Sequence, residues 1–153
     1  RDIGVTGVQT CALPISADDI REIYRVRRFL EPAAVLWSGE TSIEPLPAII
    51  KAARAAAAEG DIPGMAGANQ HFHRAIVDRA GSERLNSLMD QVLAEMRLVF
   101  HSMAANPAFH EPYVEDNAHI VELLEAGDKA AAADFLATYL DRAEAQLLDA
   151  VGR

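Results

Sequence analysis

The apolar residues of this chain recur at the spacing of an amphipathic helix, most regularly between residues 82 and 103. Steps of three and four residues place them on one helical face, and no step breaks the rhythm. The positions of this stripe are Leu85, Leu88, Met89, Val92, Leu93, Met96, Val99, Phe100 and Met103. The pattern predicts a helix with one buried side.

Five further stretches carry the signals of helix starts and ends. Side-chain oxygens cap a helix start, proline suits the first turn, and glycine ends a helix. The predicted caps are Asp18 or Asp19, Thr41 or Ser42, Asp61, Ser82 and Asp128. The predicted helices cover residues 18–37, 42–60, 61–81, 82–103, 112–126 and 128–151. Pro32 is expected to bend the first of them.

No stretch alternates with the period of a strand, so the fold class expected is all-α, an antiparallel bundle of about six helices. The 153 residues suit a single domain with one core, since half of them are apolar. Alanine runs at residues 55–58 and 130–133 also favour helix.

The charge pattern excludes two classes of protein. With 14 basic and 23 acidic residues the net charge is −9, so the chain should repel phosphate backbones and bind no nucleic acid by itself. Charged residues interrupt every helical stretch, and no apolar run reaches the roughly 18–20 residues that span a bilayer. A cytoplasmic protein without a membrane partner is expected, and the one cysteine, Cys11, lies outside the helical part, which is consistent with a reducing compartment.

Residues 1–16 do not share the helical pattern of the rest. They contain Gly4, Gly7 and Pro14 among β-favouring residues. The stretch VTGVQTCALPI at residues 5–15 resembles the conceptual translation of the reverse strand of a short-read sequencing adapter. We interpret residues 1–16 as an assembly artefact and residues 17–153 as the domain, and expect upstream coding sequence to be missing. A disordered native tail or a stray strand is the alternative.

Polar side chains interrupt the apolar stripes of four predicted helices. Arg27 lies on the first, Asn69 and His73 one turn apart on the third, Asn117 on the fifth and Tyr139 on the sixth. Each alone is more often a core residue that a neighbour satisfies than a ligand-binding residue. Burying all of them without partners would cost roughly 1–3 kcal/mol per group. A central cavity with a polar ligand is therefore favoured.

The order of these residues resembles the C-terminal effector-binding (FCD) domain of FadR-like bacterial regulators in the GntR family. The resemblance covers roughly residues 20–148, and its anchors are VRRFLEPAA at 26–34, FHRAI at 72–76 and IVELLEAGD at 120–128. It implies a helical bundle that forms a homodimer, binds a small metabolite, often a carboxylate, and controls an N-terminal winged helix-turn-helix. Nothing in this sequence resembles that DNA-binding domain, which we expect in the missing upstream part.

Many members of that family hold a transition metal with one Asp and three His. This sequence keeps only His73 of that set, while Asn69, Asn117 and Tyr139 stand at the other three positions. Because a neutral amide and a phenol are poor ligands for such a metal, we expect neither a metal nor another cofactor. The other histidines are expected at the surface: His71, His101, His110 and His119.

Without a metal, Arg27 is the group expected to orient the effector, because its planar fork matches a carboxylate. The alternative is a local ion pair between Arg27 and Glu31, one helical turn on. The amide and imidazole groups suit an acid that also carries hydroxyls, such as a sugar acid or hydroxy acid. The predicted ligand-binding residues are Arg27, Asn69, His73, Asn117 and Tyr139.

Two other classes of function stay open. A small helical enzyme could use His73 with Asn69 and Tyr139 for acid–base chemistry. The sequence places no Ser or Cys nucleophile beside them and contains no glycine-rich phosphate loop or metal-oxidase motif. We therefore expect no enzyme and assign no catalytic residue. The third interpretation is a helical module that only dimerises, which organic acids would not stabilise.

Overall fold

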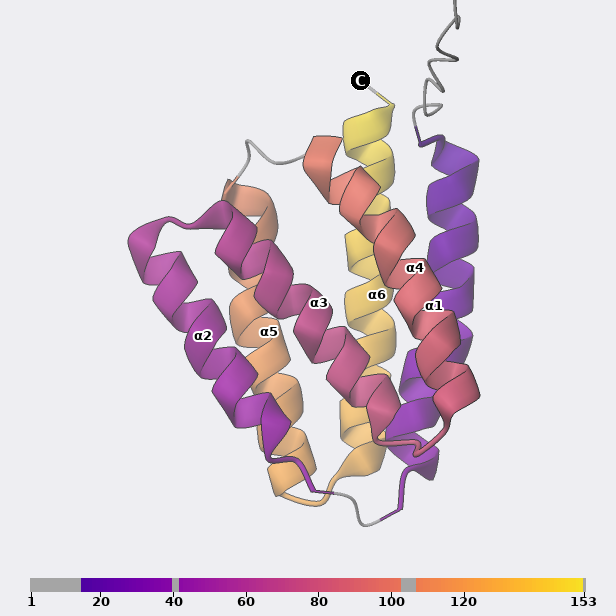
Figure 1. Cartoon of the computed structure of the whole chain (residues 1–153), viewed down its shortest axis with the longest axis vertical. Helices are drawn as coiled ribbons and strands as arrows, with labels where there is room; N and C mark the ends of the chain where they lie inside the picture. Colours follow the sequence, from indigo (N-terminus) through magenta and orange to yellow (C-terminus); the bar gives the residue numbers. More distant parts are fainter. Residues whose placement is uncertain (1–14, 40–41, 103–106, 153) are drawn as a thin grey trace, which may run out of the picture.

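The computed structural model describes residues 15–39, 42–102 and 107–152 of the chain. These residues fold into six helices (Figure 1). They are α1 (Ala17–Trp37), α2 (Pro45–Glu59), α3 (Ile62–Asp78), α4 (Glu83–Ser102), α5 (Pro107–Glu125) and α6 (Lys129–Val151). Consecutive helices run in opposite directions, and the described residues contain no strand. The antiparallel all-α bundle predicted from the sequence is confirmed.

The helices lie in two layers, with α2, α3 and α4 in front of α5, α6 and α1 in Figure 1. In the front layer α3 packs against both neighbours and also against α1 and α5 behind it. In the back layer α6 packs against α1 and α5. Polar side chains on the inner faces of α1, α3, α5 and α6 are therefore brought to the centre of the bundle.

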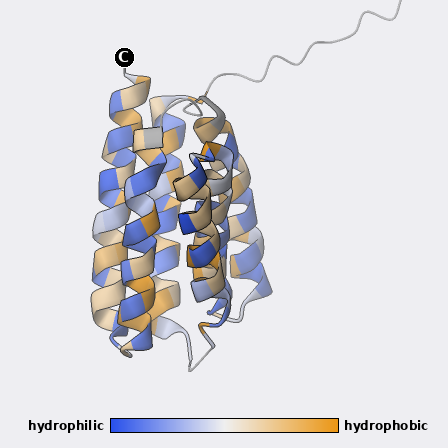
Figure 2. Cartoon of the chain, turned by 90° about the vertical axis from the view of Figure 1, so that its left-hand side faces the viewer, coloured by the Kyte–Doolittle hydropathy of each residue, from blue (hydrophilic) through white to orange (hydrophobic). Residues whose placement is uncertain are grey.

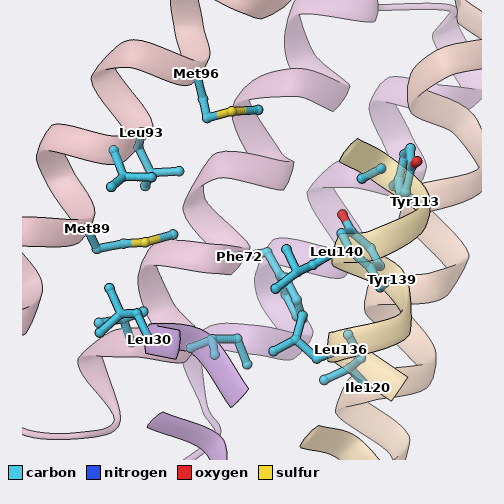
Figure 3. Packing of buried hydrophobic residues seen from close by; sticks show 14 of the residues in the cluster. Leu30, Phe72, Met89, Leu93, Met96, Tyr113, Ile120, Leu136, Tyr139 and Leu140 are labelled. Carbon is cyan, nitrogen blue, oxygen red and sulfur yellow. The ribbon is translucent and has the colours of Figure 1, made fainter. Parts of the chain in front are cut away.

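The larger of two clusters of buried apolar residues in the described part joins the two layers (Figure 3). Phe72 of α3 lies beside Leu136 and Leu140 of α6, and all three side chains are fully buried. Full burial of a side chain of this size contributes roughly 1.5–3 kcal/mol relative to exposure. The helices carry hydrophilic residues as well as apolar ones, as the colours of Figure 2 show. No helix in the described part is long and apolar enough to cross a membrane.

The helix starts follow the predicted caps in part. Asp61 and Asp128 accept backbone hydrogen bonds at the starts of α3 and α6, as predicted. The predicted Asp18 or Asp19 cap is wrong, because Ser16 caps α1 in a reciprocal capping box with Asp19. Helix α1 itself begins at Ala17, directly after this cap.

The starts of α2 and α5 also differ from the prediction. Ser42 does not cap α2, because its hydroxyl accepts a hydrogen bond from the backbone N–H of Glu44, before the helix begins at Pro45. Thr41, the alternative cap, lies outside the described residues. Helix α5 begins at Pro107 rather than at Pro112, which lies within it. Proline is favoured at the first helical position, since its missing N–H would be unpaired there anyway. The earlier start adds a first helical turn whose residues Phe109 and His110 are buried in the bundle.

The predicted apolar stripes are largely buried. On α4 the prediction is wrong for Leu88, which is 40% exposed, while Met103 lies outside the described residues. The short turn between α2 and α3 depends on Gly60, whose φ of +67° is in the left-handed region. Its N–H closes the end of α2 on the carbonyls of Ala56 and Ala57.

Candidate functional site

The predicted site residues meet in the centre of the bundle, where Glu31 joins them. The Nε of Arg27 donates to Oε1 of Glu31 at 2.6 Å, one turn along α1. The other carboxylate oxygen, Oε2, lies 2.6 Å from Nδ1 of His73 on α3. All three side chains are at most 2% exposed. A buried arginine, carboxylate and imidazole therefore form one triad.

The hydrogen bonds continue from His73 to α6 and α5. Its Nε2 lies 3.0 Å from the Tyr139 hydroxyl, which donates to Oδ1 of Asn69 at 2.9 Å. Nδ2 of Asn117 donates to the same oxygen at 2.8 Å. We call this set the buried polar network; its members are Arg27, Glu31, His73, Tyr139, Asn69 and Asn117. It links four helices and contains every predicted ligand-binding residue.

The electrostatics of the network follow from burial and from the charge of Arg27. Burial alone would raise the pKa of Glu31, but Arg27 and His73 outweigh it and hold that pKa below its usual value. Burial lowers the pKa of His73 against the opposing pull of Glu31. Burial also raises the pKa of the Tyr139 phenol well above its ordinary value. At neutral pH, Glu31 is ionised and Tyr139 is protonated.

The network corrects one argument made from the sequence. The polar side chains of α1, α3, α5 and α6 satisfy one another, so their burial does not by itself require a ligand. The local pair between Arg27 and Glu31 forms, yet Nη2 of Arg27 is buried without a hydrogen-bond partner among the described residues. Oδ1 of Asn117 is also unpartnered there. The pairing and ligand-binding interpretations of Arg27 are therefore compatible.

A small cavity lies beside the network. Its lining includes Arg27, Asn69 and Tyr139 of the network together with Phe100 and His110, while the predicted site residues His73 and Asn117 are not among its lining residues. Its volume is about 10 Å³, which is room for about one water molecule. The described structure therefore holds a closed site, and a carboxylate ligand would have to displace side chains to enter.

Aromatic rings of α4 and α5 also line the cavity, and we call them the aromatic wall: Phe100 of α4 with Phe109, His110 and Tyr113 of α5. The ring of Tyr113 contacts that of Tyr139 in the network, with centroids 4.8 Å apart. The rings meet edge to face, with centroids 4.9 Å apart for Phe109 and His110 and 5.3 Å apart for Phe100 and His110. Nε2 of His110 is buried without a hydrogen-bond partner among the described residues. Burial lowers the pKa of His110, so the imidazole is neutral at pH 7.

The sequence analysis missed His110, and its expected surface position is wrong. His110 is 3% exposed, because the early start of α5 carries it into the bundle. The available signal was its spacing of four and seven residues from Val114 and Asn117 on the same face. His71 and His119 are exposed as predicted, while the side chain of His101 lies outside the described part.

The donor set does not fit a transition metal. His73 is the one imidazole in the network, and both of its nitrogens already face Glu31 and Tyr139. Asn69 uses its amide oxygen to accept two hydrogen bonds. Among the described residues, no group of three or more His, Cys, Asp or Glu side chains is placed to hold a metal. The amides and the phenol at the other positions are poor ligands for one.

Two kinds of comparison place the chain among known proteins. Residues 22–142 match the FCD domain family. A solved structure named as a transcriptional regulator GntR from Rhodococcus sp. RHA1 is 38% identical in sequence to this chain. The match covers 88% of this chain with a TM-score of 0.84. E. coli McbR/YncC is 23% identical, with a TM-score of 0.75 over 88% of the chain, and shares the fold. No curated protein sequence matches the chain.

The chain spans 66% of the length of each of these two structures. The same share holds for Lar, which controls the expression of the Listeria monocytogenes agr system; it is 17% identical, with a TM-score of 0.76 over 91% of the chain. GntR-family regulators that carry an FCD domain are non-enzymatic transcription factors, in agreement with the expectation that this chain is not an enzyme. The chain belongs to the FCD domain family, the effector-binding domain of GntR-family transcription regulators.

Proposed function

We propose that this chain senses a small carboxylate metabolite for a bacterial GntR-type regulator and binds it at the centre of the bundle. The observation that carries the proposal is the unpartnered Nη2 of Arg27, a residue that lines the central cavity. A buried donor of a charged group without an acceptor costs more than a neutral one, and a carboxylate would supply the acceptor. Glu31 holds the guanidinium in place through Nε, so the fork is oriented before ligand arrives.

The rest of the buried polar network would position the ligand. Oδ1 of Asn117 is free to accept from a hydroxyl group. Asn69 and Tyr139 line the cavity beside Arg27, and His73 contacts the Tyr139 hydroxyl and so helps to hold it in place. No metal or other cofactor is part of this proposal, so the affinity for the acid should not change when zinc is added.

Binding would be coupled to a change of shape. Since the cavity holds about one water, the ligand must push the aromatic wall outward, which shifts the facing ends of α4 and α5. A ligand shifts a conformational equilibrium only by its difference in affinity for the two states. The closed structure and an open, ligand-bound one would differ in this way, and the difference would reach a winged helix-turn-helix on the same polypeptide.

We further propose that the parent regulator binds DNA through that domain and acts as a homodimer. A two-fold operator needs two DNA-binding halves, which a dimeric sensor domain would present. The chain should therefore sediment as a dimer at micromolar concentration. A monomer at that concentration would count against a dimeric sensor.

The test of ligand binding is a thermal-shift panel of organic acids on the 153-residue chain and two variants. A bound acid at a hundred times its dissociation constant stabilises the fold by about 2.7 kcal/mol. Arg27→Lys keeps the positive charge beside Glu31 but loses the fork, so it should weaken binding at least tenfold. The matched control is Arg54→Lys, since Arg54 pairs with Glu115 at the surface.

Two results would contradict the proposal. If no organic acid stabilises the chain, it is a dimerisation module rather than a carboxylate sensor. If an acid binds Arg27→Lys as tightly as the unaltered chain, Arg27 is not the anchor.

A further inference from the structure

A groove opens on the other side of the aromatic wall, between α3, α4 and α5. Its volume is about 270 Å³, near the lower end of small-molecule sites. Pro63, Ala66 and Gly67 form its wall on α3, and Phe100 and His110 close it toward the centre of the bundle. The small residues leave space along α3, since a Cβ at Gly67 would meet nothing within 4 Å. The groove is therefore mainly apolar and large enough for part of a ligand.

Phe100 and His110 line both the groove and the central cavity. Their rings are in edge-to-face contact, with an interplanar angle of 73°. The two spaces are thus neighbours that share these two side chains. His110 also brings an unpartnered Nε2, which as a neutral N–H can donate to a carboxylate.

We propose that the groove is the second half of the effector site and that the effector is a carboxylate with an apolar arm. This inference rests on the proposed function. The carboxylate would accept hydrogen bonds from Nη2 of Arg27 and Nε2 of His110. The arm would pass between Phe100 and His110 and lie along Ala66 and Gly67.

The pairing within the bundle favours an apolar arm over a hydroxylated one. Asn69, His73 and Tyr139 already make their hydrogen bonds with one another or with Glu31. In the described part, the network has two unpartnered buried atoms, Nη2 of Arg27 and Oδ1 of Asn117. With Nη2 bound to the carboxylate, only Oδ1 of Asn117 would be left in the network to accept a hydrogen bond from a hydroxyl of a polyhydroxylated acid. In the groove, Gln70 and Arg97 are the polar lining residues besides His110, and hydroxyls placed against Ala66 and Gly67 would be buried on apolar surface without partners, which is unfavourable. We therefore expect an aliphatic or aromatic acid rather than a sugar acid.

The first experiment is calorimetric titration of the 153-residue chain with acetate, propionate, butyrate and hexanoate. Affinity should rise by about fourfold for each methylene that enters the groove, the factor that corresponds to burying one such group. Gluconate has the same number of carbons as hexanoate and serves as the hydroxylated comparison. It should bind more weakly than hexanoate.

The second experiment fills the groove from α3. Gly67→Leu places a side chain in the open space and replaces a glycine within a helix, so the fold should tolerate it. Hexanoate affinity should fall at least tenfold, while acetate affinity stays within twofold. Gly67→Ala is the matched control, because it makes the same backbone change with a single methyl group and should keep hexanoate affinity within about threefold.

The outcomes separate the two proposals. If no acid binds, the proposed function fails. If acetate binds through Arg27 but affinity does not rise with chain length, or if gluconate binds more tightly than hexanoate, the groove is not part of the site. Equal hexanoate binding by Gly67→Leu and Gly67→Ala would also overturn the assignment of the groove.

Discussion

The two sides of the central cavity differ in how they treat buried polar groups. The buried polar network, on α1, α3 and α6 with Asn117 of α5, pairs a charged arginine with a carboxylate and connects an imidazole, a phenol and two amides. On the side of α4 and α5, the aromatic wall buries the His110 imidazole and leaves its Nε2 unpartnered among the described residues.

This difference separates a role in stability from a role in binding. The hydrogen-bonded groups of the network hold the helices in one arrangement, and loss of one of them leaves its partners unpaired, whereas Nη2 of Arg27 and Oδ1 of Asn117 are unpartnered like Nε2 of His110 in the described part. An unsatisfied group lowers stability and is typical of a site that awaits a ligand, because activity and stability often compete. Substitutions in the buried polar network should therefore mainly lower the stability of the fold, and substitution of His110 should mainly lower the affinity for the ligand.

The largest effect is expected for Glu31→Gln. It leaves the buried charge of Arg27 uncompensated, so the free energy of unfolding should fall by about 3–5 kcal/mol. Urea denaturation measures this change. Glu115→Gln removes the same charge from an exposed pair with Arg54 and should cost at most about 1 kcal/mol. Equal losses for the two variants would show that the buried polar network adds no special stability.

A pair of histidine substitutions compares the two sides directly. His73→Leu removes one of the two partners of Glu31 and one of the two partners of Tyr139, and should destabilise the fold by about 1–3 kcal/mol. His110→Leu removes an imidazole with an unpartnered nitrogen, so stability should stay the same or rise by up to about 1 kcal/mol, while carboxylate affinity falls. Both are read from urea denaturation together with calorimetry. A stability loss as large for His110 as for His73 would remove the distinction.

Tyr139→Phe should have a smaller effect, about 1–2 kcal/mol of destabilisation, because Asn69 and His73 each lose one partner. Tyr113→Phe removes a hydroxyl that donates to the half-exposed Gln146 and should cost less than about 1 kcal/mol. Thermal denaturation of the two variants in parallel checks the order. The reverse order would place the stronger polar contacts in the aromatic wall.

The smallest effect is the pH dependence of stability. Burial lowers the pKa of both His73 and His110, so the unfolded chain binds more protons than the folded one below about pH 6.5. The free energy of unfolding should fall as the pH falls, by up to about 1.4 kcal/mol per pH unit for each histidine. His110→Leu should reduce this slope between pH 6.5 and 5.5. An unchanged slope would show that His110 is not held neutral by burial.

Helical periodicity and turn residues were enough to predict the bundle and the position of the buried polar network. The inward faces of α3, α5 and α6 are regular, so Asn69, His73, Asn117 and Tyr139 could be placed from spacing alone. Whether these side chains pair with one another or with a ligand could not be predicted, because the pairing depends on how the four helices pack. His110 was lost because a proline pair around the first turn of α5 hid the start of that helix.

The most direct test is a crystal structure of the chain with the tightest-binding carboxylate. We predict a carboxylate oxygen about 2.7–2.9 Å from Nη2 of Arg27, with Nε2 of His110 donating to the same group and the contact between Arg27 and Glu31 kept. The rings of Phe100 and His110 should have moved apart. A carboxylate bound at the surface, with the central cavity still closed and Nη2 of Arg27 still unpartnered, would contradict the account.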